Sequence, residues 1–388
     1  MKKVCIVTGS RAEYGILQPL IYKLSKDEEI ELQIIATGMH LSPEFGLTYK
    51  QIENDGYKIN EKIETVLSSD TTVGISKAIG LGLISFAEVY QRLNPDLIII
   101  LGDRYEIFAA ASAAMVSKIP IAHLHGGELT EGAIDEAIRH AITKMSYLHF
   151  TSTEVYRQRV IQLGEAPERV HNVGALGVEN VKKMKLLTKD ILEERLQFKF
   201  DKKVALITFH PVTLEDRTSQ EQFQVLLEAV DYFMDLKIIF TKANADADGR
   251  IINSMIDKYV KRHADRCVAF TSMGQEKYLS ALQYSSIVIG NSSSGIIEVP
   301  SFNIPTVNIG DRQQGRIKSK SVIDCGVKVI QIKQAIESGL SKQNKVFQLK
   351  NINPYEKENT TEQIILHIKK FLKQTHITFK KKFYDLEQ

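Results

Sequence analysis

The sequence predicts two doubly wound α/β domains, each built on a parallel sheet. A chain of 388 residues is longer than one hydrophobic core usually supports, so two domains are the starting expectation. Short apolar runs alternate with longer stretches of helical periodicity, as in parallel sheets whose strands are buried on both faces. This alternation occurs twice, before and after the polar, Lys-rich stretch Lys182–Lys203. Successive βα units of this kind form Rossmann-like folds with right-handed crossovers.

The first series of elements occupies residues 1–175. Its expected strands are Val4–Thr8, Leu32–Ala36, Leu97–Leu101, Ile119–Leu124 and Leu148–Thr151. Its expected helices are Ile16–Ser25, Thr72–Leu93, Tyr105–Ser117, Ile134–Tyr147 and Val155–Leu163. The first four strand runs are continuously or nearly continuously apolar, which suits central positions in a parallel sheet.

The second series occupies residues 176–360. Its expected strands are Val204–Phe209, Leu236–Thr241, Cys267–Phe270, Ser286–Ile289 and Thr306–Ile309. Its expected helices are Gln220–Phe233, Arg250–Arg262, Gln275–Gln283 and Lys333–Ser338. A last helical pattern, Thr361–Lys373, lies beyond this series, and composition alone does not say which domain it packs on.

Composition and charge exclude several classes of protein. The chain has 50 Lys and Arg against 47 Asp and Glu, and a net charge of +3 gives no indication of nucleic-acid binding. Its three cysteines are far apart and predict reduced thiols rather than a disulfide framework or a metal site. The apolar run before Gly9 is too short for a signal peptide, and no stretch approaches the ~18 apolar residues of a membrane helix. We therefore expect a soluble, cytoplasmic chain that binds neither nucleic acid nor a membrane.

Polar clusters follow the expected strands, at the sheet edge where open α/β sheets bind ligands. The loop Gly9–Gly15 follows the first strand and carries Arg11, so free N–H groups and a guanidinium could hold an anion there. A tight strand–helix turn with a solvated arginine explains this loop equally well. The loop is not GxGxxG, so a dinucleotide fingerprint is absent. Asp103, just past Leu97–Leu101, is either the N-cap of the next helix or a site residue.

The next strand ends in the motif HLHGGE, whose last residue is Glu128, and Asp135 follows at the start of a helix. Adjacent strand ends would bring Asp103, Glu128 and Asp135 into one region. Carboxylates brought together raise one another's pKa, which prepares one to act as an acid while another stays a base. These three residues are therefore candidates for proton transfer.

The histidines and glycines of this region are less specific signals. His123 and His125 alternate along the strand, so they face opposite sides unless the strand has already ended. A histidine satisfied by the backbone is the plainer account of either one. The pair Gly126 and Gly127 would allow the backbone to approach a substrate closely. His210, just past Val204–Phe209, is by itself more typical of a structural histidine.

The strongest local signal is the loop Gly290–Gly295, which reads GNSSSG and joins a strand to a helix. Its hydroxyls, bare N–H groups and helix start suit a phosphate better than they suit an ordinary Ser-rich turn. The predicted ligands of a diphosphate in this loop are Ser292, Ser293, Ser294 and Gly295. Glu298 could accept hydrogen bonds from ribose hydroxyls, and Arg312 supplies a positive partner.

These clusters, in this order, resemble the UDP-N-acetylglucosamine 2-epimerases. The matching motifs are TGSRAEYG, ATGMH, LGDRYE, HLHGGE, TFHP, IGNSSSG and NIGDRQ, which span nearly the whole chain. The resemblance is closest to the hydrolysing branch, which makes N-acetylmannosamine for sialic acid synthesis. It implies the GT-B fold, in which two Rossmann-like domains face each other across a cleft. It also implies that residues 361–388 return to the first domain.

The resemblance assigns roles to the matching residues. The implied catalytic groups are Asp103, Glu128, Asp135 and His210, and the implied ligands of the UDP-sugar are Arg11, His40, Arg104, Asn244, Ser292, Ser293, Glu298 and Arg312. The non-hydrolysing bacterial branch has basic residues and an asparagine directly after the equivalent of His210. Here the chain reads Pro211-Val212-Thr213-Leu214-Glu215 instead, which favours release of UDP over its return to the sugar.

The implied reaction is an elimination followed by hydration. UDP leaves C1, a carboxylate removes the C2 proton, another acid reprotonates the opposite face, and water adds at C1. No metal or cofactor is expected, because protein cations and dipoles meet the charge of the leaving group. The expected partners are the UDP-sugar and UDP, and the family is expected to form homodimers or homotetramers.

Several alternatives stay open. The sugar could be a 2,4-diacetamido-trideoxyhexose used for legionaminic-type acids, since pocket shape decides one or two ring substituents. A non-enzymatic UDP-sugar-binding protein would keep the loop Gly290–Gly295 (the serine loop) without needing the carboxylates. A glycosyltransferase of the same fold needs only one base, and a metallophosphoesterase needs an Asp-x-His that the segment Thr8–Ser10 lacks. The sequence does not identify which carboxylate is the base, the subunit number or any allosteric control.

Overall fold

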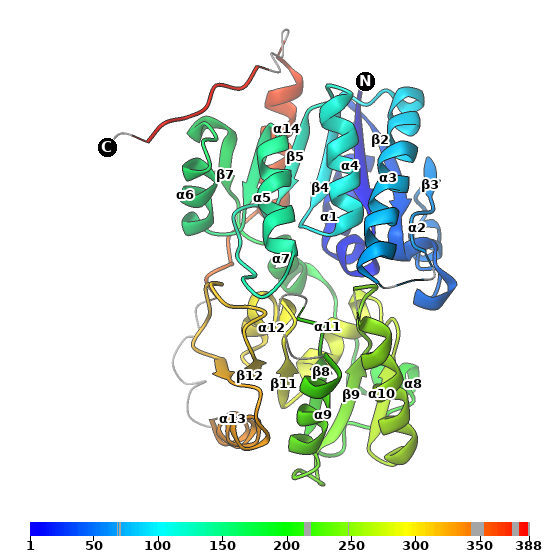
Figure 1. Ribbon diagram of the computed structural model, residues 1–388, viewed down its shortest axis with the longest axis vertical. Coiled ribbons are helices and arrows are strands. Elements are labelled where there is room, and N and C mark those ends of the chain that lie inside the picture. Colours follow the sequence, from blue (N-terminus) through cyan, green and yellow to red (C-terminus); the bar gives the residue numbers. More distant parts are fainter. Residues whose placement is uncertain are drawn as a thin grey trace. The chain divides into compact units, whose positions relative to one another are not determined.

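The computed structural model describes residues 1–67, 69, 71–212, 219–246, 248–342, 353–374 and 380–386. It divides into two compact units, each with its own sheet (Figure 1). Unit 1 comprises Met1–Glu128, Ile134–Asn180 and Tyr355–Gln388, and unit 2 comprises Leu129–Ala133 and Val181–Pro354. The main crossing from unit 1 to unit 2 therefore falls after Asn180, and the return falls before Tyr355.

Unit 1 is a parallel sheet with the strand order β3-β2-β1-β4-β5-β6-β7. Its strands are β1 (Lys2–Thr8), β2 (Ile30–Thr37), β3 (Glu61–Ile63), β4 (Leu97–Leu101), β5 (Ile121–Leu124), β6 (Leu148–Thr151) and β7 (Val170–Asn172). Its α-helices are α1 (Arg11–Ser25), α2 (Tyr49–Asn54), α3 (Thr72–Leu93), α4 (Tyr105–Val116), α5 (Asp135–Met145), α6 (Glu154–Gln162), the start of α7 (Leu176–Lys183) and α14 (Thr360–Leu372). Short 3-10 turns are η1 (Gly38–Leu41), η2 (Pro43–Phe45) and η3 (Pro167–Arg169).

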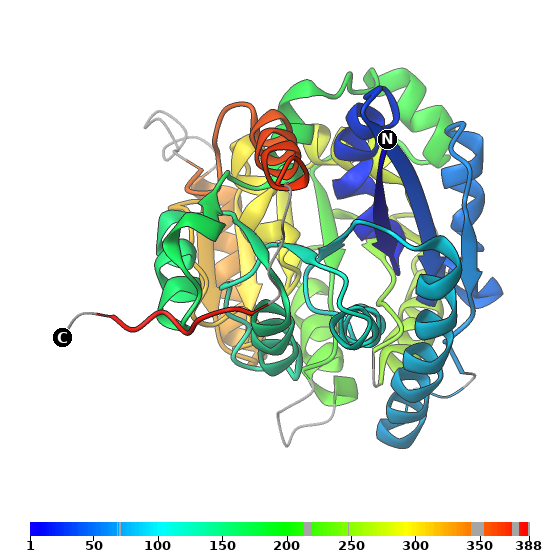
Figure 2. The same ribbon diagram turned by 90° about the horizontal axis from the view of Figure 1, so that it is seen from above.

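Successive residues of the central strands point to opposite faces of this sheet, and each face has its own core. Val4 and Ile6 of β1 pack into a cluster with α1 and α14, whereas Cys5 and Val7 pack into a cluster with α3, α4 and α5. The apolar side of α14 lies in the first cluster, to which Ile368 contributes a fully buried side chain. The view from above separates these helical layers on the two faces (Figure 2). Burial on both faces explains why the strand sequences are continuously apolar.

Helix α3 corrects one expectation from the sequence. Thr72–Leu93 is long and apolar enough, by length and composition, to cross a membrane, although we expected no such stretch. Few charges and several small residues raise its hydropathy, while Phe86, Val89 and Tyr90 on one side are buried against the sheet and α4. Core helices pass the same test, so this helix alone is weak evidence for a membrane span.

Unit 2 is a second parallel sheet, with the order β10-β9-β8-β11-β12-β13. Its strands are β8 (Val204–Thr208), β9 (Lys237–Thr241), β10 (Cys267–Phe270), β11 (Ile287–Gly290), β12 (Thr306–Ile309) and β13 (Val322–Cys325). Its helices are the end of α7, α8 (Lys189–Leu196), α9 (Ser219–Val230), α10 (Gly249–Arg262), α11 (Gln275–Tyr284), α12 (Ser294–Ile297), the 3-10 turn η4 (Val299–Phe302) and α13 (Val329–Lys342). Ala205 and Ile207 of β8 face α9 and α13, and Leu206 faces α8 and α11.

The two sheets have the same topology. In each one the chain runs outward through three strands and then restarts on the other side of the first, so strand order reverses between β1 and β4 and between β8 and β11. Ligands of open α/β sheets bind outside the carboxyl ends of the strands at such switch points. The prediction of two Rossmann-like parallel sheets is confirmed. The strands that it missed, β3, β7 and β13, are three or four residues long and lie at sheet edges.

Candidate active site

The switch point of unit 1 begins with the loop after β1. Ser10 is the N-cap of α1 and accepts the N–H of Glu13 at 3.3 Å, while the Oε2 of Glu13 accepts the N–H of Gly9 at 2.7 Å. The expectation that these N–H groups face an anion is therefore wrong for Gly9 and Glu13, because side chains of the loop already occupy them. Arg11 is the first residue of α1 and is half-buried.

Two buried carboxylates flank Arg104 at the end of β4. The Nε of Arg104 donates to Oε1 of Glu106 at 2.7 Å and lies 4.0 Å from Oε1 of Glu13. Burial, and then the charge of Glu106, raise the pKa of Glu13 to about 8. A Cβ on Gly9 would lie 2.6 Å from Glu106, so glycine is needed there to admit the carboxylate. The hydrogen bond to Glu106, two residues along the chain, thus holds the side chain of Arg104 in place.

His40 lies in η1 with its ring fully buried. Its Nε2 lies 3.1 Å from Oγ1 of Thr8, and its Nδ1 lies 2.8 Å from Oγ1 of Thr48. Burial lowers the pKa of His40 to about 4, so the ring is neutral at physiological pH. Both nitrogens are engaged by threonines, which fixes the orientation of the ring at the ends of β1 and β2.

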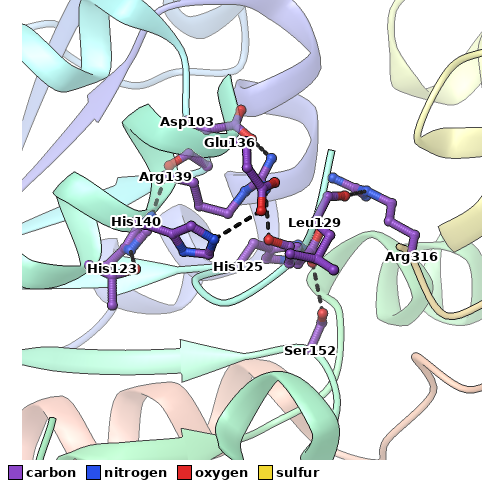
Figure 3. Close-up of polar contacts among 12 residues, drawn as sticks. Asp103, His123, His125, Leu129, Glu136, Arg139, His140, Ser152 and Arg316 are labelled. Carbon is purple, nitrogen blue, oxygen red and sulfur yellow. Dashed lines mark hydrogen bonds and ion pairs between the residues drawn. The ribbon is translucent and has the colours of Figure 1, made fainter. Parts of the chain in front are cut away.

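A buried arginine on α5, Arg139, connects the carboxylate of Asp103, after β4, to the backbone of Glu128, after β5 (Figure 3). Its Nη2 pairs with Oδ2 of Asp103, and its Nη1 donates to the backbone oxygen of Glu128 at 2.7 Å and to Oε2 of Glu136 at 3.0 Å. Its side chain is only 1% exposed. The sequence prediction that Asp103 and Glu128 share one region is supported by this arrangement, and Arg139 is the residue that we did not anticipate.

The structure also decides between the two interpretations of Asp103. The N-cap of α4 is Arg104, so Asp103 is not the cap of that helix and points instead toward Arg139. Asp135, the third predicted carboxylate, is the first residue of α5 and is half-buried. The next residue, Glu136, pairs with Arg139 and lies 3.0 Å from Nε2 of His140.

The two histidines of the HLHGGE motif differ. His123 lies within β5, where its Nε2 is 2.8 Å from the oxygen of Gly102 and its Nδ1 is 3.2 Å from Oγ1 of Thr143. Burial lowers its pKa to about 3, as expected for a core histidine. β5 ends at Leu124, so His125 lies past the strand, and its Nδ1 is 2.9 Å from Oε1 of Glu128. His125 therefore faces a carboxylate rather than the backbone.

The interpretation of the two glycines as room for a substrate is wrong. A Cβ on Gly126 would lie 3.0 Å from Oγ1 of Thr143, and one on Gly127 would lie 2.5 Å from the oxygen of Tyr156. Gly127 also has a φ of +78°. The space beside both residues is filled by α5 and α6, so these glycines allow close packing within unit 1.

In unit 2, one asparagine joins three of the predicted segments. Asn291 follows β11, and its side chain accepts the N–H of His210 at 2.7 Å and donates to the oxygen of His210 at 2.8 Å. The backbone oxygen of Asn291 accepts Nη1 of Arg312 at 3.1 Å and Nε2 of Gln313 at 2.9 Å. Asn291 is fully buried, and it fixes His210 and Arg312 relative to the serine loop.

The serine loop has the expected small residues but a shorter helix than expected. Ser292 and Ser293 are half-buried, and Ser294 accepts the hydroxyl of Tyr278 at 2.8 Å. Helix α12 covers only four residues before the 3-10 turn η4, so its dipole contributes less than we assumed. Glu298 is buried at the junction of α12 and η4.

The remaining predicted positions are placed as follows. Gly295 packs against Thr306 of β12, with room for no side chain. Asn244 is half-buried in the loop between β9 and α10. Thr213, Leu214 and Glu215, on which the argument for release of UDP partly rests, lie outside the described residues.

Together the two sheets and their switch points define a protein of two Rossmann-like domains with a GT-B-like fold, with clustered ionisable side chains after the strands of one domain and a small-residue loop after a strand of the other. A sequence model of the family described as UDP-N-acetylglucosamine 2-epimerase matches residues 22–369. The chain belongs to this family and is an epimerase, so the resemblance seen in the sequence is confirmed.

Individual relatives of known sequence or structure point to the same family. The chain is 45% identical over 344 residues to a GDP/UDP-N,N'-diacetylbacillosamine 2-epimerase (hydrolyzing) of Campylobacter jejuni, covering 88% of this chain and 89% of that protein. It is 41% identical to polysialic acid biosynthesis protein P7 of Escherichia coli, covering 100% of this chain and 98% of that protein. The crystal structure of the Methanocaldococcus jannaschii UDP-GlcNAc 2-epimerase in complex with UDP-GlcNAc and UDP has a TM-score of 0.79 at 19% identity, covering 95% of this chain and 99% of that one.

Proposed function

We propose that this enzyme is a hydrolysing 2-epimerase of a UDP-linked 2-acetamido sugar. The observation that carries the proposal is the buried guanidinium of Arg139, which holds Asp103 and the backbone of Glu128 together beyond the carboxyl edge of the unit 1 sheet. A site that only bound a sugar nucleotide would not need acid–base groups assembled at the cost of burying an arginine. Inversion of a carbon centre does need them.

In the proposed reaction, unit 2 holds the leaving group. Ser292, Ser293 and Arg312 contact the diphosphate, and Glu298 contacts the ribose. Positive charge and N–H groups at the diphosphate stabilise the charge that develops as the C1–O bond breaks. Departure of UDP makes the proton at C2 acidic enough for removal, which gives an unsaturated sugar. Asp103, Glu128, Asp135 and His210 are the proposed groups for proton transfer, and addition of water at C1 completes the reaction.

Two observations favour hydrolysis and a diacetamido sugar. The residues after His210 lack the basic run of the non-hydrolysing branch, and the 45% identical relative is named as a hydrolysing enzyme. That relative acts, by its name, on diacetylbacillosamine, so we propose a UDP-2,4-diacetamido-2,4,6-trideoxyhexose as the preferred substrate. UDP-N-acetylglucosamine is the second candidate, because the relative that matches the whole chain is named for polysialic acid biosynthesis. We further propose a cytoplasmic homodimer or homotetramer.

The test is proton NMR of the purified enzyme in deuterated water with each UDP-sugar in turn. We expect UDP and a free 2-epimeric sugar that carries deuterium at C2, and a higher kcat/KM for the diacetamido substrate than for UDP-N-acetylglucosamine. A product still linked to UDP would overturn hydrolysis. A higher kcat/KM for UDP-N-acetylglucosamine would reverse the order of substrates, and binding of UDP without any turnover would indicate a binding protein.

A further inference from the structure

The two ring nitrogens of His125 have different surroundings. Nδ1 is 2.9 Å from Oε1 of Glu128, whose side chain is 3% exposed. Nε2 is buried, and no residue in the part of the chain that the structure describes forms a hydrogen bond with it. His40 and His123 differ in this respect, since threonine hydroxyls or backbone occupy both of their nitrogens. A buried polar atom without a protein partner needs an explanation, and a site atom that meets substrate is one.

The protonation of the ring follows from its carboxylate partner. The same Oε1 of Glu128 also accepts the hydroxyl of Ser152 at 2.7 Å. An ionised carboxylate only accepts hydrogen bonds, so the proton of a neutral His125 lies on Nδ1 and the lone pair lies on Nε2. This is the arrangement by which a carboxylate orients a catalytic imidazole and stabilises the imidazolium that forms.

The backbone holds His125 in an uncommon conformation. Its φ is +65°, in the left-handed region that only a few per cent of residues other than glycine adopt, and its N–H donates to the oxygen of Phe150 at 2.9 Å. Such conformations cost ~1–3 kcal/mol and cluster at functional sites. Here the left-handed turn directly after β5 places the ring at the ligand edge of the sheet, beside Glu128.

We propose that Nε2 of His125 is the base that removes the C2 proton, and that Glu128 acts through His125 as its positioning residue. This inference rests on the proposed epimerase function and refines it. The proton passes from C2 to Nε2, the electron pair of the C2–H bond forms the C1=C2 double bond, and the C1–O electron pair leaves with UDP. His125 then releases its proton to solvent. A different acid protonates C2 on the other face as water adds its oxygen to C1, so the sum is UDP-sugar plus water giving UDP and the epimer.

The central variant is His125→Asn. Asparagine keeps a donor near the position of Nδ1 and tolerates a positive φ, but it has no base at the position of Nε2. We expect kcat to fall by ~10²–10⁴-fold, the usual contribution of a general base, with KM and UDP affinity little changed. His367→Asn is the matched control, because His367 lies in α14, which contributes no residue to the proposed site. The activity of the His367→Asn variant should equal that of the wild type. An active His125→Asn variant would overturn the proposal.

Glu128→Gln separates the two roles of Glu128. Gln can still accept the Nδ1 hydrogen but no longer carries the charge that stabilises the imidazolium, so we expect kcat to fall while KM stays little changed, with partial activity retained. The loop that carries His125 also contacts Arg139 of α5, through the oxygen of Glu128, and Arg159 of α6, through the oxygen of Gly127. Both arginines, and Asp103 paired with Arg139, are unchanged in the variant. If Glu128 is itself the base, the variant is inactive at every pH, and the proposal fails.

A readout that does not need turnover distinguishes failure of this inference from failure of the proposed function. Nitrogen-15 NMR of the histidine-labelled wild type, assigned with His125→Asn, reports which nitrogen is protonated. We expect His125 to be protonated at Nδ1, whereas a free imidazole favours the proton on Nε2. A proton on Nε2 would overturn the inference even in an active epimerase, and a proton on Nδ1 would support it even if both UDP-sugars stay intact.

Discussion

The two sheets have one strand order, but different side chains lie at their switch points. In unit 1 the loops after β1, β4 and β5 carry charged groups that neutralise one another, chiefly through Arg104 and Arg139. In unit 2 the loops after β8 and β11 are joined by the amide of Asn291, which accepts the N–H of His210 and donates to the oxygen of His210. Equal topology therefore positions two kinds of chemistry, and the chemistry is decided by which residues follow the strands.

This difference agrees with the proposed roles of the two units, proton transfer at the unit 1 site and binding of UDP by the serine loop of unit 2. Proton transfer needs ionisable groups whose pKa values are controlled by burial and by each other, as for Glu13 beside Glu106. Holding a diphosphate needs hydroxyls, N–H groups and a few cations in a fixed frame, which amides and glycines supply. We therefore expect substitutions in unit 1 to change turnover and substitutions at the serine loop of unit 2 to change UDP affinity, whereas His210, which lies in unit 2, should affect turnover. The predictions below test that separation.

Of the substitutions that compare the two units, Arg139→Met is expected to have the largest effect. The variant leaves Asp103 and Glu136 without their shared cation and the oxygen of Glu128 without its donor. Breaking a buried ion pair by removing one partner costs about 3 kcal/mol or more of unfolding free energy. We expect urea denaturation to show this loss of unfolding free energy. We also expect kcat/KM to fall by ~10²–10³-fold, within the range that general acid–base catalysis contributes.

The control for this variant is the affinity for UDP, measured by calorimetry. UDP should bind Arg139→Met nearly as well as it binds the wild type, because its proposed ligands lie in unit 2. The kcat/KM of Arg139→Lys should lie between those of Arg139→Met and the wild type, since one ammonium cannot reproduce the fork of a guanidinium. A variant that keeps its turnover but loses UDP binding would contradict the division between the units.

The sequence predicted the frame of this molecule better than its site. Strands such as β1, β4, β8 and β11 were found within two residues of their ends, because burial on both faces leaves a continuously apolar run. Edge strands such as Glu61–Ile63 were missed, because one neighbour and partial exposure impose no such pattern. Helix starts were predicted less well: α1 begins at Arg11 rather than Ile16, and α13 begins at Val329 rather than Lys333.

For the site, strand ends pointed to Asp103, Glu128 and His210, because the ends of parallel strands meet at one edge. Arg139 was missed, because a polar residue on an amphipathic helix is usually solvated, and its burial depends on three segments that converge only in the fold. One signal was available. Asp135 precedes Arg139, and Glu136 precedes His140, by four residues each, a spacing that places charged pairs on one side of a helix.

The second effect in size is expected for Asn291→Ala in unit 2. The variant removes both hydrogen bonds to the backbone of His210 in a fully buried position, and each unsatisfied buried group costs ~1–3 kcal/mol. We expect the serine loop and Arg312 to lose their fixed spacing and UDP to bind ~10-fold more weakly, a change of ~1.4 kcal/mol. Asn54→Ala, at an exposed position of α2, is the control. Unchanged UDP affinity would contradict the proposed role of the serine loop.

The smallest effect on function is expected for Glu13→Gln, which changes the pH dependence of stability instead. Burial and the charge of Glu106 raise the pKa of Glu13 from 4.5 to about 8, so the folded chain keeps a proton that the unfolded chain loses between these values. Stability therefore falls as pH rises through this window, by at most ~1.4 kcal/mol per pH unit from this group. Gln carries no titrating proton and can still accept the N–H of Gly9. The unfolding free energy of the variant should therefore equal that of the wild type near pH 4.5 and exceed it near pH 8.

Urea denaturation across this pH window measures the difference. Glu28→Gln, at an exposed position, is the control that should follow the wild type. Parallel curves for wild type and Glu13→Gln would mean that Glu13 is ionised in the folded chain, and the charges of unit 1 would then be balanced by cations alone.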